Sequence, residues 1–124
     1  MVAHSLAPRL TDMIEAIEVV RANTENVTLE AFEADRDKRW LVERAVEIIS
    51  EASRHLSDEL KARHPDIPWQ QVAGVGNVLR HDYARVAPQV IWAVAHEHLQ
   101  ELDKVCRDEL EREKKQEQQR ERER

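Results

Sequence analysis

Apolar residues recur with the period of an α-helix in four stretches of the chain. These stretches cover residues 6–20, 41–60, 69–79 and 90–106. Asp35 is placed to cap the second helix, and the pair His64–Pro65 would end it. Pro68 and Pro88 stand where the third and fourth helices begin. A short helical turn around Phe32 comes before Asp35. The pattern predicts an all-α chain of four to five helices joined by short connections.

Composition and charge narrow the class of protein. The 124 residues fit one domain, and two glycines and four prolines leave few turns. A formal net charge of -6 argues against a protein that coats nucleic acid through bulk electrostatics, although it allows a local basic site. Cys106 cannot form an internal disulfide, no apolar run could span a bilayer, and the start lacks a secretion signal. We therefore expect a cytoplasmic protein that binds neither membranes nor DNA.

The composition changes near residue 106. We assign residues 1–106 to a helical domain and residues 107–124 to a charged extension. The extension holds seven basic and seven acidic residues, so the excess negative charge lies in the body. Pairs such as Glu111 with Lys115 favour a solvated helix, and a frayed tail is the alternative.

Both glycines of the chain, Gly74 and Gly76, fall inside the third predicted helix. Each costs roughly 1 kcal/mol relative to alanine in a helix interior. Two explanations stay open at this point. One is close packing of another part of the chain against this face, and the other is room for a substrate.

Polar residues follow the glycines. Asn77 and His81 are four residues apart and share a face, whereas Gly76 and Arg80 share the neighbouring face. An imidazole that takes the proton of a 2′-hydroxyl and a guanidinium that stabilises a phosphorane would suit RNA cleavage without a metal. A structural histidine is the competing interpretation. The histidine spacings elsewhere do not favour a metal site, and we expect no cofactor.

The sequence resembles the HepT family of HEPN-domain ribonuclease toxins over about residues 6 to 106. Four segments carry the resemblance: Val42-Glu43-Arg44-Ala45-Val46-Glu47-Ile48-Ile49-Ser50-Glu51-Ala52, Pro65-Asp66-Ile67-Pro68-Trp69, Gly74-Val75-Gly76-Asn77-Val78-Leu79-Arg80-His81-Asp82-Tyr83, and Val90-Ile91-Trp92. The combination of Pro-x-Ile-Pro-Trp with the later His-x-Tyr is specific, whereas no single segment is.

This resemblance implies an up-and-down helical bundle of the HEPN type. It also implies a homodimer in which two helices bearing His81 meet in a shared cleft. The implied activity is metal-independent endoribonuclease cleavage of RNA, with tRNA a target class. The implied partner is an MntA-type nucleotidyltransferase antitoxin, which would neutralise the toxin by attaching AMP to Tyr83.

The chain departs from the family pattern at one position. The family motif is an arginine, then four to six intervening residues, then the histidine, and with four intervening residues the arginine position is Gly76. Arg80 lies one turn further on, so we expect Arg80 to replace the missing arginine in space that Gly76 leaves free. Asn77 and Gly76 would support His81 and Arg80. The alternative is a catalytically weak or inactive helical module that binds a nucleotidyltransferase.

Overall fold

The computed structural model describes the backbone of residues 5–81, 92–93 and 96–124, and their side chains except those of 78–81. Within these residues all regular structure is helical, which confirms the all-α prediction. The helices are α1 (Ala7–Thr24), α2 (Leu29–Ala34), α3 (Arg36–Ser53), α4 (Asp58–Arg63), α5 (Trp69–His81) and α7 (Leu99–Arg122).

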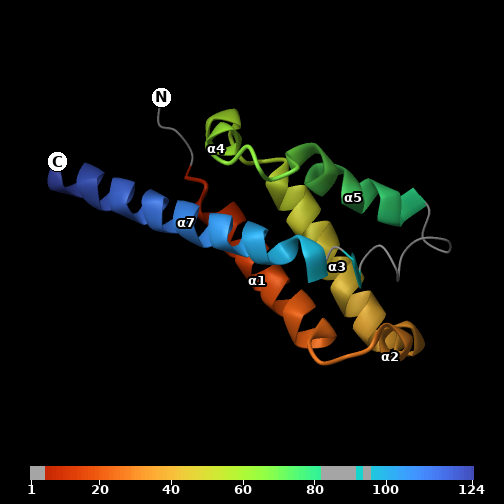
Figure 1. The fold of residues 1–124 in the computed structure, drawn as a ribbon. Coiled ribbons are helices and arrows are strands. Elements are labelled where there is room, and N and C mark those ends of the chain that lie inside the picture. The colour runs from red at the N-terminus through yellow and green to blue at the C-terminus, as the bar shows by residue number, and fades with distance from the viewer. Residues whose placement is uncertain (1–4, 82–91, 94–95) are drawn as a thin grey trace.

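Helix α3 lies at the centre of the bundle. It packs against α1 on one side and α5 on the other, while α7 runs across α1 and α2 covers the first turn of α3. Figure 1 shows that α1, α3 and α5 run in alternating directions, as in an up-and-down bundle. The broad apolar face of α3 explains this position, because a helix in contact with neighbours on two sides must be apolar toward both.

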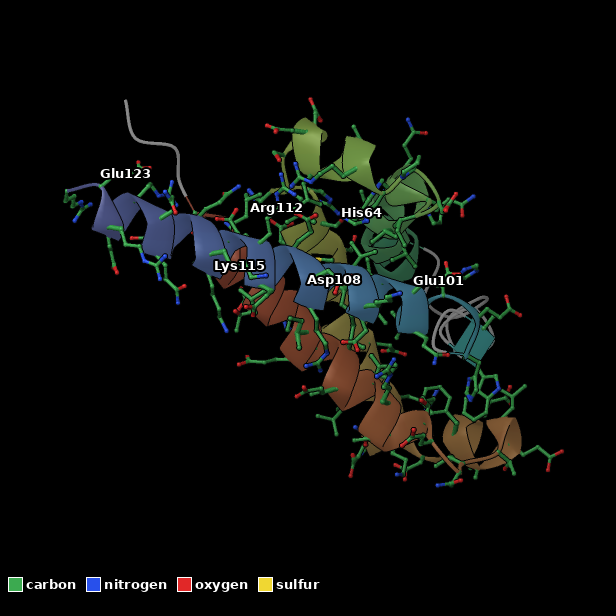
Figure 2. All side chains as sticks on the ribbon, turned by 60° about the vertical axis from the view of Figure 1, so that its left-hand side comes forward. His64, Glu101, Asp108, Arg112, Lys115 and Glu123 are labelled. Carbon is green, nitrogen blue, oxygen red and sulfur yellow. The ribbon has the colours of Figure 1, made fainter. Side chains whose placement is uncertain are left out.

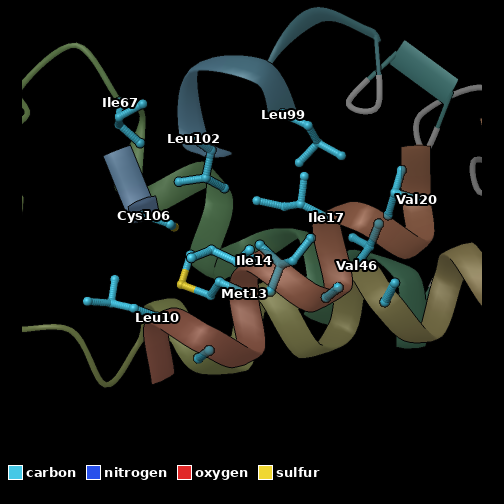
Figure 3. Packing of buried hydrophobic residues seen from close by; sticks show 14 of the residues in the cluster. Leu10, Met13, Ile14, Ile17, Val20, Val46, Ile67, Leu99, Leu102 and Cys106 are labelled. Atoms are coloured by element: carbon cyan, nitrogen blue, oxygen red, sulfur yellow. The ribbon is translucent and has the colours of Figure 1, made fainter. Parts of the chain in front are cut away.

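A single apolar core joins α1, α3 and α7 (Figure 3). Leu10, Met13 and Ile17 of α1 are fully buried, and so is Cys106 of α7. Their spacing of three to four residues places each set on one face of its helix. The apolar stripes of the sequence therefore form the core of the folded chain.

The second long stretch divides into two helices, which differs from the single helix that the sequence predicts. Helix α3 ends at Ser53, and α4 begins only at Asp58. The side chain of Ser57 accepts a hydrogen bond from the backbone N–H of Leu60 at 3.1 Å, so it caps a new helix. Leu60 is still fully buried. This break raises the number of helices among the described residues to six.

Salt bridges and hydrogen bonds between charged side chains connect the end of α4 to α7. Glu109 of α7 is only 4% exposed and accepts hydrogen bonds from Arg63 at 2.6 and 3.2 Å. His64 Nε2 lies 2.8 Å from the same carboxylate, and Figure 2 shows His64 beside α7. The body of the protein thus reaches Glu109, slightly past residue 106, and the division at that residue stays a prediction.

The charged segment after residue 106 continues α7 to Arg122. Figure 2 shows Arg112, Lys115 and Glu123 spread along this part of the helix. All residues from 114 onward are exposed. None of the described helices is both long and apolar enough to cross a membrane.

Candidate functional site

Helix α5 carries the motif that the sequence singles out. Its start is fixed by Trp69, whose indole N–H lies 3.2 Å from the carbonyl of Lys61 and 3.0 Å from that of His64. Val72 and Val75 pack against the core. The helix then continues to His81, its last described residue. The ring of Trp69 at one end and the apolar contacts in the middle therefore set the direction in which the motif is presented.

Gly76 packs against the side chain of Ser50 on α3. A Cβ atom at position 76 would lie 2.9 Å from Ser50 Oγ, closer than such atoms normally approach, and 3.1 Å from Ser50 Cβ, a distance at which Ser50 would have to shift slightly. Neither glycine has a positive φ, so close packing and not backbone conformation requires Gly76. Of the two explanations left open by the sequence, the structure supports close packing at this position.

The expectation that Gly76 leaves space for Arg80 is therefore wrong. The direction in which a side chain at position 76 would point faces α3, and the side chain of Ser50 occupies that space. Gly74 differs, because a Cβ atom there would meet no atom of the described residues within 4 Å beyond the adjoining helix backbone and its two chain neighbours. The open position on α5 is Gly74, two residues away from the one expected.

Ser50 forms the polar link between α3 and α5. Its hydroxyl donates to the carbonyl of Ala73 at 2.7 Å and accepts from the backbone N–H of Gly76 at 3.2 Å. The side chain is fully buried, so both bonds form away from water. A buried hydroxyl with two partners on one neighbouring helix holds the register of α5 against α3.

Arg54 lies next to this link, at the C-terminal end of α3. Its Nε donates to the carbonyl of Ala73 at 3.2 Å, and its Nη1 lies 3.3 Å from Glu51. Its Nη2 is 3.5 Å from Ser50 Oγ and 3.8 Å from the point where a Cβ at position 76 would stand. Sequence reasoning did not single out Arg54. No local signal could have done so, because the contact joins residues about twenty positions apart on two helices.

Glu51, near the C-terminal end of α3, contacts basic side chains. Its carboxylate binds His55 at 3.2 Å as well as Arg54. The hydrogen bond from His55 and the charges of Arg54, His55 and Arg9 lower the pKa of Glu51, against an opposing effect of burial. Glu47, one turn earlier on α3, pairs with Arg44 at 3.3 Å. Each of these two glutamates thus binds an arginine of its own helix.

The remaining predicted site residues lie at the end of α5 or beyond it. Asn77 is exposed, one helical turn before His81. Arg80 and His81 have described helical backbones, but their side chains lie outside the described part of the chain, as does Tyr83 altogether. The predicted roles of these three residues stay predictions.

An apolar hollow of about 380 Å³ lies between α3, α5 and the start of α7. Val46, Val72, Val75 and Leu102 are among its lining residues, and Gly74 opens onto it. Neither Asn77 nor Gly76 lines it. The described lining of the hollow is thus mostly hydrophobic, and of the polar residues of the motif whose side chains the structure describes, Asn77 does not contribute to it.

Two further candidates for chemistry can be judged from the structure. Among the described residues, no group of three or more His, Cys, Asp or Glu side chains is arranged to hold a metal ion. Burial, together with the charge of Asp103, raises the pKa of the Cys106 thiol to about 12. A thiol with so high a pKa in the core is not a nucleophile at neutral pH.

Comparison with known proteins assigns the chain to a family. The family described as ribonuclease HepT-like matches residues 13–109. The chain is similar to "Probable ribonuclease HepT" of Thermococcus cleftensis, with 37% identity over 93 residues, which cover 75% of this chain and 84% of that protein. It is 30% identical to a "Putative RNase" of Methanocaldococcus jannaschii over 95 residues, or 77% of this chain and 87% of that protein. A "Putative RNase" of Caldanaerobacter subterraneus is 29% identical over 107 residues, or 86% of this chain and 96% of that protein. No solved structure matches the chain.

Proposed function

Because the chain belongs to the HepT-like ribonuclease family, we propose that it is a metal-independent endoribonuclease with its site at the C-terminal end of α5. The placement of the motif carries this proposal. Helix α5 continues unbroken to His81, and exposed Asn77 precedes His81 by one turn on the same face. The imidazole at position 81 and the amide at position 77 can therefore act on one bound RNA strand.

His81 acts as the general base in this proposal. It takes the proton of a ribose 2′-hydroxyl, and the resulting oxygen attacks the adjacent phosphorus. The bond from phosphorus to the 5′-oxygen breaks, and that oxygen takes up a proton as it leaves. Arg80, next to His81, supplies positive charge to the phosphorane, and Asn77 orients the strand by hydrogen bonding.

The cellular role that fits this chemistry is that of a toxin. In this role the protein is a homodimer that cleaves tRNA and is neutralised by an MntA-type nucleotidyltransferase antitoxin. The antitoxin attaches AMP to Tyr83, two residues after His81. AMP adds bulk and negative charge beside the site, so it repels the phosphates of RNA and stops cleavage.

A cleavage assay on the purified full-length protein tests the activity. Wild-type protein should cut a tRNA pool in the presence of EDTA, and His81→Ala should lose at least a hundredfold in rate because the general base is gone. His98→Ala is the matched control, since His98 is an exposed histidine just before α7, remote in sequence from the motif. Equal rates for His81→Ala and the wild type would refute the role of His81.

Growth assays with a co-expressed transferase test the regulation. The transferase should protect cells from the wild-type chain but not from Tyr83→Phe, which keeps the ring and loses only the acceptor hydroxyl. Mass spectrometry should find the AMP on Tyr83. Modification at another residue, or full protection against Tyr83→Phe, would contradict the assignment.

A second function is favoured by one observation, the contact between Gly76 and Ser50. The position at which the family motif places its arginine has no side chain, and α3 fills the adjoining space. We therefore also consider a module with little or no nuclease activity that acts by binding a nucleotidyltransferase. Absence of both toxicity and RNA cleavage in the wild-type protein, together with a stable complex with the transferase, would support it.

A further inference from the structure

The end of α3 that touches α5 carries a cluster of positive charge in an acidic protein. The Arg54 cluster consists of Arg54, His55, Glu51 and Arg9, and Glu51 is the carboxylate that binds Arg54 and His55. The chain as a whole has a formal net charge of -6, so a cluster with two arginines around one glutamate stands out. Local positive charge of this kind is what a protein without bulk basic character needs to bind a phosphate.

Arg54 is held in place by protein contacts on one side. Its guanidinium has five N–H donors. Among the described residues, Ala73, Glu51 and Ser50 accept from three of them, one on each nitrogen. One donor on each terminal nitrogen therefore stays available, and the side chain is 39% exposed to solvent. Such a fixed fork loses little conformational entropy when it binds a second anion.

Arg54 lies beside position 76, where α5 carries no side chain. Its Nη2 lies 3.8 Å from the point at which a side chain at position 76 would begin. The guanidinium of Arg54 therefore stands beside the position where the family motif has its arginine. From there to His81 the helix rises five residues, or about 7.5 Å along its axis.

We propose that Arg54 binds a phosphate of the RNA strand whose neighbouring linkage His81 cleaves. The proposal deepens the proposed ribonuclease function and rests on it for the identity of the ligand. The RNA runs along α5, with the base at the end of the helix and the phosphate-binding arginine supplied by α3. Arg54 of α3 thus supplies the positive charge that α5 lacks at position 76.

RNA binding measured without cleavage tests the proposal. In a His81→Ala background, a fluorescent single-stranded RNA oligonucleotide is titrated with full-length protein at several salt concentrations. Arg54→Ala should weaken binding by about tenfold, since a charge-assisted hydrogen bond is lost. It should also reduce the slope of log K against log salt by about 0.7, the value for one phosphate contact on a single strand.

Arg44→Ala is the matched control. Arg44 lies on the same helix and pairs with Glu47 at 3.3 Å, the same distance as the Arg54–Glu51 pair, but it is 71% exposed and forms no bond to the described side chains or backbone of α5. Arg54→Lys separates charge from geometry: it should keep the salt slope of the parent and lose part of the affinity. Thermal denaturation of each variant identifies any effect that comes from unfolding.

The outcomes separate this proposal from the ribonuclease function. If the wild type cleaves RNA, and Arg54→Ala binds RNA with the affinity and salt slope of Arg44→Ala, the role of Arg54 is refuted and the function stands. If the wild type does not cleave RNA but Arg54→Ala lowers both affinity and slope, the phosphate site stands and the nuclease proposal fails.

Discussion

The two glycines of α5 should respond to the same substitution with opposite signs. Both lie in regular helix with ordinary φ, so replacement by alanine removes about 1 kcal/mol of unfavourable helix propensity at either position. At Gly74 the new methyl group meets nothing within 4 Å in the part of the chain that the structure describes, apart from its own stretch of helix. Gly74→Ala should therefore stabilise the protein by about 0.5–1 kcal/mol.

At Gly76 the same methyl group would lie 2.9 Å from Ser50 Oγ. Ser50 would have to move, which costs about 1–3 kcal/mol of strain. Movement also weakens the bonds of its hydroxyl to Ala73 and Gly76, worth about 1 kcal/mol each. After the gain in helix propensity, Gly76→Ala should still destabilise the protein by about 1–3 kcal/mol.

Urea denaturation followed by circular dichroism measures both variants. We expect urea midpoints on either side of the wild type, and free energies of unfolding that differ between the two variants by about 1.5–4 kcal/mol. Measurements at two protein concentrations separate folding from any self-association. In a Ser50→Ala background the cost of Gly76→Ala should fall, because the clashing oxygen is gone. Equal effects at Gly74 and Gly76, or a Gly76→Ala cost unchanged in that background, would refute the reasoning.

Three further predictions concern the rest of the bundle. Burial opposes ionisation of Glu109, but hydrogen bonds from Arg63 and His64 lower its pKa below the ordinary 4.5. The stability that Glu109 contributes is therefore complete above pH 4.5 and lost as the pH falls through the lower folded pKa. Glu109→Gln should be less stable than the wild type at pH 7 in urea titrations, and the difference should shrink as the pH falls below 4.5. Cys106, with a pKa of about 12, should react with a thiol reagent at pH 8 only after unfolding, and rapid reaction of the folded protein would contradict its burial. Ser57→Ala should cost about 1 kcal/mol in thermal denaturation because α4 loses its cap, whereas Ser5→Ala, with an exposed hydroxyl at the chain start, should cost less.

The sequence contains enough information for the helices and their apolar faces, since both depend on local periodicity. Asp35 caps α3 as expected, accepting a bond from the N–H of Lys38 at 3.1 Å. The break before α4 was missed because Leu56 and Leu60 continue the apolar period across it. Ser57 followed by Asp58 and Glu59 is a helix-start signal that could have revealed the break, but periodicity alone cannot register it.

The candidate site was predictable only as far as α5 extends. Spacing along one helix places Asn77 and His81 on a common face, and the structure leaves that placement intact. The environment of Gly76 depends on Ser50 and Arg54, which α3 contributes through packing between helices. A contact across two helices depends on their rotation and distance of approach. One sequence does not specify these quantities, so the space expected beside Gly76 could not be tested before the fold was known.

The backbone amides of helix α7 are expected to exchange with solvent at very different rates in its two halves, although the helix is continuous. Its first half holds Leu99, Leu102 and Cys106 in the core, so amide hydrogen exchange there requires opening of the bundle. Past residue 113 every side chain is exposed, and the side-chain contacts of this end are local, such as Arg120 with Glu117 at 3.1 Å. Its amides exchange by helix–coil fluctuation alone, faster toward Arg122 and faster again at high salt. Protection should therefore fall along α7 without any break in the helix.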